Sequence, residues 1–319
     1  MILLFPEERD ISTDNVTEWL HFYGAKFLRI NEDNQNVIKS VEIDDCDTRF
    51  EFSINNLGFD EIGSVWFRRG ALGYRSDFET ISGKSHHVNR QIANHIYREM
   101  QTIFQFIYLL LQSRYTINAP TAYNLNKLEM LFLAKQAGLH IPETLVTNNY
   151  EMVKDWGSRA DGLITKALSD NIDFYDENRN YGMGTKGLPG LANKFYYSLF
   201  QFKIDRYCEI RTFYIEDEFY SMAIFVDEDL VDVRSLRLDN NKARLVPYKL
   251  PKQITQKLLA LTKSKGINCG SIDLILTKDK RYVFLELNPV GQYDYLEKCC
   301  NYPISKIMAE KLIKHEQIF

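Results

Sequence analysis

Two segments near the C-terminal end of the sequence decide the fold: Gly270-Ser271-Ile272-Asp273-Leu274 and Phe284-Leu285-Glu286-Leu287-Asn288-Pro289. In both, a few polar residues stand among apolar ones, which is typical of strands that are largely buried. The turn-forming residues Lys278–Lys280 lie between the two segments. The pattern therefore predicts a hairpin of two strands, Ser271–Thr277 and Tyr282–Leu287.

The polar residues of this hairpin form a candidate metal site. Side chains alternate along a strand, so Glu286 and Asn288 share a face, and Asp273 lies on the facing strand. Two carboxylates and an amide oxygen are hard ligands of the kind that hold Mg²⁺. The alternative is that the acidic residues are merely solvated, but their apolar neighbours indicate a buried strand, where unpaired carboxylates would be costly. The sequence therefore predicts that Asp273, Glu286 and Asn288 bind a metal.

The composition is that of an ordinary globular protein. Of 319 residues, 45% are apolar and 26% are charged, and 39 Lys and Arg against 43 Asp and Glu give a net charge of −4. A mildly acidic chain does not favour nucleic-acid binding, which depends on basic residues that neutralise phosphates. No apolar run reaches the roughly 18–20 residues of a bilayer span, and the N-terminus lacks the basic region of a signal peptide. We therefore expect neither a nucleic-acid partner nor a membrane.

The cysteines indicate a reducing compartment. There are five of them, an odd number, and none belongs to a C-x-x-C motif. Neither a disulfide framework nor a zinc ribbon follows from this pattern. We therefore expect reduced thiols in a cytoplasmic protein.

The first part of the chain alternates strands and helices. Ile2–Phe5 and Lys26–Ile30 have the apolar character of buried strands, and a helix capped by Ser12 or Thr13 lies between them. A strand, a helix and a strand in this order favour a parallel pair. A long helix, Ser85–Gln112, follows.

Three domains are predicted. The break at Asn118-Ala119-Pro120 separates an N-terminal α/β domain, 1–117, from a central domain, 118–200, in which helix and strand alternate again. From 201 to 319 the pattern is rich in strands, with a hairpin that turns at Glu216-Asp217-Glu218. The predicted fold class is therefore α/β, with an α+β C-terminal half.

Two lysines and a glycine-rich stretch mark the central domain. Lys127 lies near the start of a helix, and Lys166 closes the apolar strand Gly162–Lys166, from which it can reach a phosphate. The polar segment Ser169–Lys194 is predicted to be the least structured part of the chain, and its run Gly182–Gly187 is formally G-x-G-x-x-G. No strand pattern precedes this run, so it is not a dinucleotide or kinase motif. A glycine lid over phosphates and a plain linker both remain open.

The order of these residues resembles that of the ATP-grasp ligases. The resemblance covers roughly residues 118–300, and its landmarks are Lys127, Lys166, the glycine stretch, Gln201-Phe202-Lys203-Ile204, Glu209-Ile210-Arg211, Asp273, Glu286 and Asn288. Three further segments look more specifically like the grasp-with-spasm peptide maturases, the graspetide or microviridin-type macrocyclising ligases: Met1–Thr13, Ser64–Arg69 and Phe284–Gln292. This narrower resemblance extends over almost the whole chain.

The resemblance implies an ATP-grasp fold that holds ATP between two β-sheet-containing domains, with two Mg²⁺ ions. Lys127 and Lys166 would hold the phosphates, and Glu209 would take the ribose hydroxyls. The strand that reads adenine, mainly through its backbone, would be Gln201, Phe202, Lys203 and Ile204. Asp273, Glu286 and Asn288 would bind Mg²⁺, and Arg211 and Arg234 would contact the phosphates or an acyl phosphate. Two positions depart from the family: Phe202 stands where many members carry Glu, and Ser271 where some carry Arg.

The implied activity is that of an ATP-dependent carboxylate–amine or carboxylate–hydroxyl ligase. The partner would be a precursor peptide with a leader and a core, whose Asp or Glu side chains are joined to Ser or Thr hydroxyls or to Lys amines. Two alternatives stay open: a ligase that adds free amino acids to a peptide or protein terminus, and a non-catalytic ATP-binding regulatory module. The sequence leaves the oligomeric state open, with a homo-oligomer as one outcome.

Two surfaces are predicted to bind the peptide. The hairpin Glu209–Val226 offers Tyr214, Phe219 and Tyr220 as aromatic anchors for the leader. Arg68 and Arg69 would attract the acidic residues of the core.

Overall fold

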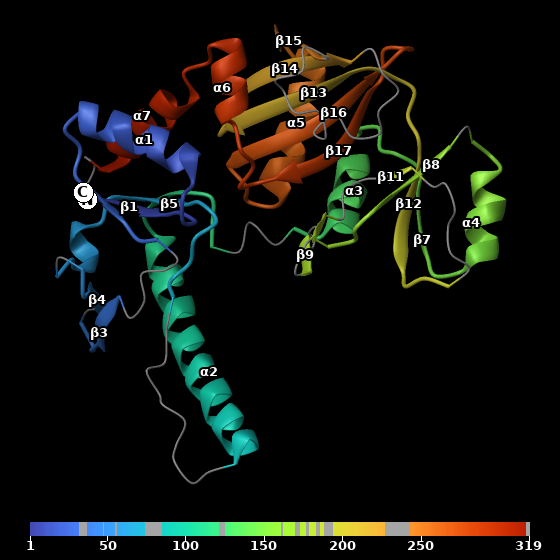
Figure 1. Cartoon of the computed structure of the whole chain (residues 1–319). Coiled ribbons are helices and arrows are strands. Elements are labelled where there is room, and N and C mark those ends of the chain that lie inside the picture. Colours follow the sequence, from blue (N-terminus) through green and yellow to red (C-terminus); the bar gives the residue numbers. More distant parts are fainter. Residues whose placement is uncertain are drawn as a thin grey trace. The chain divides into compact units, whose positions relative to one another are not determined.

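The computed structural model describes residues 1–31, 37–46, 48–54, 56–73, 85–120, 125–160, 162–169, 173–176, 179–182, 186–187, 194–226 and 243–316. The chain forms two compact units (Figure 1), of which unit 1 comprises Met1–Tyr123 with Pro303–Phe319 and unit 2 comprises Asn124–Tyr302. Within the described ranges, no helix combines the length and the apolar character needed to cross a membrane. All five cysteines are free thiols.

Unit 1 is built on a parallel sheet with the strand order β2-β1-β5-β6. Its strands are β1 (Ile2–Phe5), β2 (Phe27–Arg29), β5 (Ser64–Phe67) and β6 (Tyr115–Ile117). β1 pairs in parallel with both β2 and β5, because α1 (Ile11–Phe22) carries the chain back between β1 and β2. The predicted parallel pair is confirmed.

Helices cover both faces of this sheet. On one face, Tyr108 of α2 (His86–Leu111) lies edge-on to Phe5 and Phe67, with ring centroids 6.3 and 5.7 Å away. On the other face, α1 packs against the C-terminal helix α7 (Ile304–Glu316), which also contacts β1, β5 and β6. A short antiparallel hairpin completes unit 1 with β3 (Ile38–Ile43), β4 (Thr48–Phe52) and the 3₁₀ turn η1 (Phe59–Glu61).

Unit 2 contains two larger antiparallel sheets. The first has the order β11-β8-β12-β7, with β7 (Thr144–Thr147), β8 (Leu163–Lys166), β11 (Lys186–Gly187) and β12 (Ser198–Phe202). The second has the order β15-β14-β13-β16-β17, with β13 (Arg206–Ile215), β14 (Glu218–Val226), β15 (Ala243–Tyr248), β16 (Cys269–Thr277) and β17 (Tyr282–Asn288). The predicted hairpin near the C-terminal end is β16–β17, and it is confirmed.

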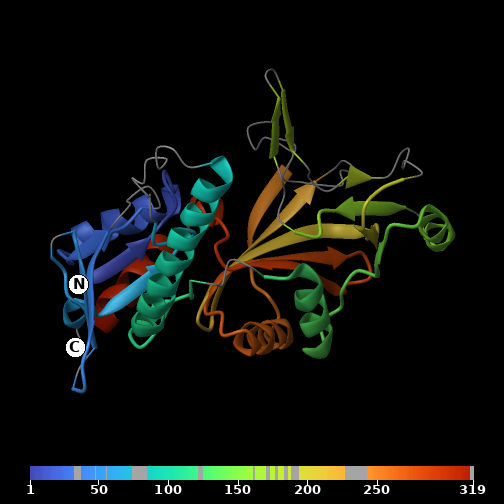
Figure 2. The same ribbon diagram turned by 90° about the horizontal axis from the view of Figure 1, so that it is seen from below.

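One face of the five-stranded sheet is buried under two helices, α3 (Lys127–Gln136) and α5 (Lys252–Ser264). Figure 2 shows both helices, green and orange, on the same side of this sheet. Two further helices complete unit 2, α4 (Tyr150–Gly157) beside β7 and α6 (Asp294–Cys300) against β14 and β15. Because α3 and α5 cover one face with apolar residues, the polar residues of β13, β16 and β17 are left to the opposite face.

Two local features differ from what the sequence pattern suggests. The segment predicted to be least structured, Ser169–Lys194, contains the antiparallel pair β9 (Asp173–Asp176) and β10 (Arg179–Gly182) as well as β11, which pairs with β8. Cross-strand pairing stabilises a polar stretch whose sequence carries no apolar alternation. Of the glycine stretch, residues 183–185 lie outside the described residues.

The helix cap of α1 also differs. Asp10, rather than Ser12 or Thr13, is the N-cap, and its carboxylate accepts a hydrogen bond from the Thr13 N–H at 3.0 Å. Asp is as good an N-cap residue as Ser, so the sequence alone could not separate the candidates.

The predicted domain boundaries, 1–117, 118–200 and 201–319, stay predictions. The division into two units differs from them in that α7 belongs to unit 1, although it comes last in the chain. Its apolar face completes the cover of the N-terminal sheet, with Met308, Ala309 and Leu312 fully buried.

Candidate functional site

The two predicted phosphate lysines lie on elements that meet in unit 2. Asn126 caps α3 by accepting hydrogen bonds from the N–H groups of its first turn, and this fixes where Lys127 begins the helix. The Lys127 ammonium donates to the carbonyl of Ala167 at 3.2 Å and also to the carbonyl of Ser169. Ala167 directly follows Lys166, the last residue of β8. The structure therefore brings the Lys127 ammonium to the strand end that carries Lys166.

The predicted adenine strand is held by its side chains. Gln201 is buried, and its Nε2 donates to the Thr144 hydroxyl at 3.0 Å, so this side chain supports the sheet. The Phe202 ring stacks on Trp156 of α4, with centroids 4.0 Å apart and planes at 21°. Trp156 is a contact that sequence reasoning missed, because the two residues are far apart in the chain. The side chains of Gln201 and Phe202 are thus engaged within the protein, and the predicted contact to adenine is one made by the backbone of this strand.

Two backbone hydrogen bonds hold the chain at the end of β12. The N–H of Phe202 donates to the carbonyl of Glu143 at 3.3 Å, and the N–H of Lys203 donates to the carbonyl of Gly162 at 3.0 Å. Among the described residues, the backbone of Ile204 takes part in no such bond. Phe202 and Lys203 are therefore held through their backbone N–H groups, and Ile204 directly follows them.

The charged residues lie in a row across three neighbouring strands. Arg211 of β13 pairs with Asp273 of β16, and Asp273 pairs with Glu286 of β17. Asn288 stands two residues beyond Glu286, opposite Ser271. These four residues lie on the sheet face that points away from the core. The opposite face packs under α3 and α5 and buries Ile272, Leu274 and Leu287. The arrangement predicted from the alternation is present.

A β-bulge turns Glu286 onto this face. Asp273 pairs with Glu286, but the next residue of β16, Leu274, pairs with Phe284, so Leu285 is the extra residue. Phe284 belongs to the buried core, and in a regular strand Glu286 would share its face. The bulge reverses the alternation, and Glu286 therefore faces its partner Asp273 outside the core. The sequence gives no sign of this bulge.

The donor set fits a hard divalent cation. Asp273 and Glu286 are opposite each other in a fixed register and half-buried, and Asn288 follows on the same face. The Asn288 Oδ1 accepts a hydrogen bond from the Val290 N–H at 3.1 Å, and this bond orients the amide. An amide oxygen has two lone pairs, so the second one can bind a cation. No group of three or more His, Cys, Asp and Glu that could hold a metal lies in the described part of the chain. Two carboxylates and one amide are a set of another kind, typical of Mg²⁺ bound together with phosphates.

Arg211 and Glu209 already have partners in the protein. The Arg211 guanidinium donates to the carbonyl of Gln292 at 3.2 Å, and its Nη1 lies 3.9 Å from the Asp273 carboxylate. Glu209 accepts a charge-assisted hydrogen bond from Arg206 at 2.7 Å. Arg206 is a second residue that sequence reasoning missed. Arg234, the other predicted catalytic arginine, lies outside the described residues.

The prediction that Arg68 attracts acidic peptide residues is wrong. Its side chain is 3% exposed, and its guanidinium donates to both carboxylate oxygens of Asp10, at 3.2 and 3.3 Å, and to the Ser12 hydroxyl. Arg68 therefore links β5 to the start of α1 and is closed to a substrate. Arg69 is partly exposed and pairs with Glu7 at 3.0 Å.

The aromatic anchors proposed for the leader are largely structural. Tyr214 is fully buried in the core of unit 2, and Phe219 stacks on it with centroids 5.8 Å apart. Tyr220 is half-buried and donates to Glu218. The prediction is wrong for Tyr214, because the hairpin β13–β14 lies inside a five-stranded sheet and one of its faces forms the core.

Comparison with known proteins decides the fold. No protein-family model and no curated protein matches the chain. The macrocyclase MdnC from Microcystis aeruginosa MRC, in a crystal structure with the precursor peptide MdnA, is 26% identical with a TM-score of 0.74, over 98% of this chain and 99% of MdnC. A RiPP-associated ATP-grasp ligase from Chryseobacterium gregarium, in complex with ADP and a leader and core peptide, is 23% identical with a TM-score of 0.78, over 98% and 96% of the two chains.

The chain has the ATP-grasp fold. A third structure, the ATP-grasp ligase PsnB complexed with minimal precursor, Mg and ADP, is 19% identical with a TM-score of 0.72, over 99% of this chain and 98% of PsnB. The ATP-grasp resemblance predicted from the sequence is confirmed, including its narrower form, because these neighbours are RiPP-type ATP-grasp ligases and a macrocyclase. The nucleotide, metal and precursor peptide bound to them are the ligand classes predicted here for this ATP-grasp chain.

Proposed function

We propose that this chain is an ATP-dependent peptide maturase of the macrocyclising ATP-grasp type. It activates Asp or Glu side-chain carboxylates of a ribosomally made precursor peptide as acyl phosphates. It then joins them to Ser or Thr hydroxyls as esters, or to Lys amines as amides, and so forms macrocycles. The observation that carries this proposal is the full-length similarity to a macrocyclase bound to its precursor peptide. The row of Arg211, Asp273 and Glu286 on one sheet face supports it.

Each set of residues would have a distinct task. Lys127 and Lys166, on elements that meet, would hold the phosphates of ATP, and the Ile204 backbone would read the base. Glu209, oriented by Arg206, would accept hydrogen bonds from the ribose. Asp273, Glu286 and Asn288 would hold Mg²⁺, which when bound neutralises the charge of the triphosphate. Gln201, Phe202 and Lys203 would position the base-reading strand.

The reaction balances in two steps. The substrate carboxylate attacks the γ-phosphorus of ATP in line, and the bond to the bridging oxygen breaks to release ADP. The hydroxyl or amine then attacks the acyl carbon, loses its proton, and expels inorganic phosphate. Arg211 faces the row of acidic residues and would stabilise the negative charge that develops on the acyl phosphate. Arg234 would be a second such arginine.

We also propose a cytoplasmic location, since the enzyme consumes ATP and its five cysteines are free thiols.

The enzyme is separated from a non-catalytic module by the release of ADP. The purified chain is mixed with ATP and Mg²⁺, with and without the precursor encoded beside it, a short peptide rich in Ser or Thr and in Asp or Glu. A maturase releases ADP at a rate that depends on the peptide. ADP release that is absent in both mixtures would support the module and overturn the proposal.

Replacing Lys166 with Ala is expected to weaken ATP binding by about 100-fold, because a charge-assisted contact to phosphate is worth about 1.5–3 kcal/mol. Glu209→Ala is expected to weaken binding more modestly, by about tenfold, through the loss of charge-assisted hydrogen bonds to the ribose. Calorimetric titration with ADP and with a non-hydrolysable ATP analogue measures both. Lys154→Ala, on the exposed surface of α4, is the matched control and should bind like the wild type. Unchanged affinity in the Lys166 and Glu209 variants would contradict the assignment.

A core peptide without its leader is expected to be modified slowly, because the proposed enzyme recognises the leader away from the reacting residues. The leader added as a separate chain should restore part of the rate. Single-turnover rates with the full precursor, the core alone, and the core plus free leader test this. If the core alone reacts as fast as the full precursor, no separate leader site exists.

A further inference from the structure

The turn Asn288–Gln292, which begins at the last residue of β17, packs closely against the start of β16. Gly291 and Ser271 are both buried. A Cβ placed on Gly291 would lie 2.5 Å from the Cβ of Ser271 and 2.6 Å from its Oγ, far inside van der Waals contact. Gly270 is packed as closely, since a Cβ there would lie 2.7 Å from the carbonyl of Asn288. The turn therefore occupies one position that these contacts determine.

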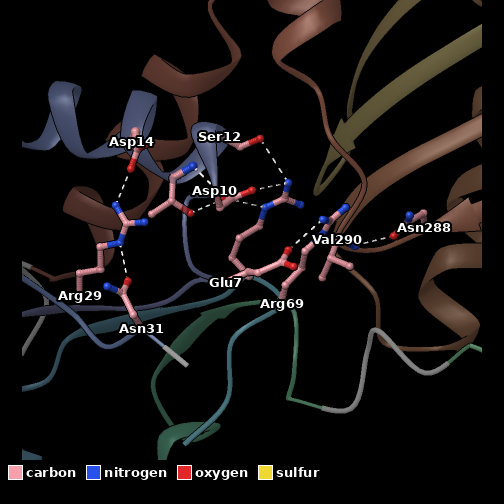
Figure 3. A network of polar contacts seen from close by, with 11 residues as sticks. Glu7, Asp10, Ser12, Asp14, Arg29, Asn31, Arg69, Asn288 and Val290 are labelled. Carbon is pink, nitrogen blue, oxygen red and sulfur yellow. Dashed lines mark hydrogen bonds and ion pairs between the residues drawn. The ribbon is translucent and has the colours of Figure 1, made fainter. Parts of the chain in front are cut away.

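The same turn orients the amide of Asn288. The N–H of Gly291 donates to the Asn288 carbonyl at 3.0 Å. The N–H of Val290 donates to the Asn288 Oδ1 at 3.1 Å, as Figure 3 shows. A shift of Gly291 away from Ser271 would carry both donors with it. The direction in which the Asn288 oxygen points therefore depends on the contact between Gly291 and Ser271.

The end of the turn also holds Arg211. The carbonyl of Gln292 accepts from the Arg211 guanidinium at 3.2 Å and from the Ser271 hydroxyl at 3.4 Å. Arg211 lies beside Asp273, with 3.9 Å between its Nη1 and the Asp273 Oδ1. The turn is thus linked to two of the three proposed metal ligands, to Asn288 directly and to Asp273 through Arg211.

We propose that Ser271 and Gly291 are positioning residues for the metal site: their contact sets the Asn288–Gln292 turn, and the turn sets the geometry in which Asn288 and Asp273 bind the cation. The inference rests on the proposed function in one respect, that Asp273, Glu286 and Asn288 hold Mg²⁺. Neither Ser271 nor Gly291 donates an electron pair to the metal in this account. Residues of this kind typically change metal affinity by about 10–100-fold when they are replaced.

The test measures metal binding directly, with Mn²⁺ as the probe. Mn²⁺ is titrated into ADP alone and into ADP with the protein, and the loss of the free-ion electron paramagnetic resonance signal beyond that caused by ADP alone measures the ion bound to the protein. Gly291→Ala is expected to lower the Mn²⁺ affinity at least about tenfold. The double variant Ser271→Gly with Gly291→Ala removes the two Ser271 atoms that lie under 3.0 Å from the new Cβ and leaves the Asn288 carbonyl oxygen at 3.1 Å, so it should recover most of that loss. Gly58→Ala is the matched control, because a Cβ there meets its nearest atom at 3.7 Å and the affinity should not change.

Each outcome has one meaning. If the wild type binds no Mn²⁺ in the presence of ADP, the proposed function fails. If the wild type binds and Gly291→Ala binds equally well, the positioning role is wrong and the proposed function stands. A loss that the double variant does not recover also overturns the role of Ser271.

Should circular dichroism show that Gly291→Ala does not fold, Ser271→Thr adds a methyl group to the same contact from the other side. A folded Ser271→Thr with wild-type affinity would overturn the inference, and a weakened one would support it.

Discussion

Replacing Asp273 with Asn is expected to abolish peptide-dependent ADP release while the protein stays folded. The substitution keeps the size of the side chain and removes one negative charge from a row in which Arg211 and Glu286 are its direct neighbours. Two unit charges about 4 Å apart have an interaction energy of about 4 kcal/mol at an effective dielectric constant of about 20. That energy corresponds to a fall in rate of about 10³-fold.

Asp205→Asn is the control for this experiment. It makes the same chemical change at an exposed residue of unit 2, which pairs with Lys278 at 2.8 Å on the surface. We expect wild-type ADP release from this variant, because exposed ion pairs contribute little. ADP release by Asp273→Asn within a factor of about ten of the wild type would contradict the metal assignment.

Replacing Arg68 with Met is expected to lower the free energy of unfolding by about 3–5 kcal/mol, because it leaves the buried carboxylate of Asp10 without its partner. The two side chains are 3% and 2% exposed. Arg69→Met is the control, since Arg69 and Glu7 are 30% and 48% exposed and such pairs are worth about 1 kcal/mol or less. Urea unfolding at neutral pH measures both. Equal stability losses in the two variants would contradict the distinction drawn here.

The loss of stability in Arg68→Met should depend on pH, because it depends on the ionisation of Asp10. Burial by itself raises the pKa of Asp10, but the charge of Arg68 and the hydrogen bonds from Thr13 and Arg68 outweigh it, so the pKa lies below its ordinary value of 3.8. The stabilisation is therefore fully present above pH of about 4 and is lost as the pH falls through the lower, folded-state pKa. The stability difference between wild type and Arg68→Met should shrink between pH 7 and pH 3. A difference that stays constant over this range would count against an ionised Asp10 as its cause.

Much of the site was predictable because it depends on local alternation. The hairpin β16–β17 follows from its pattern of polar and apolar residues, and so does the shared face of Glu286 and Asn288. The strand β1 coincides with the apolar stretch Ile2–Phe5, from which it was predicted. The lysine at the end of β8 could be found because a charge that closes an apolar strand is unusual.

The rest depends on contacts between distant parts of the chain. The stack of Phe202 on Trp156 joins a strand to a helix far away in the sequence, and no pattern around either residue announces it. The ion pair of Arg68 with Asp10 spans 58 residues, so two adjacent arginines looked equally accessible in the sequence. The bulge at Leu285 is set by the pairing of β17 with β16, and pairing register cannot be read from one strand alone.

Macrocyclisation of the precursor is tested most directly by the mass of the peptide product. The full precursor is incubated with the enzyme, ATP and Mg²⁺, and analysed by mass spectrometry with tandem fragmentation. A macrocyclising ligase predicts the loss of one water for each bond formed, with fragmentation suppressed inside the ring. A product that instead gains the mass of an amino acid residue, or a precursor that stays unchanged while ADP is released, would contradict the account.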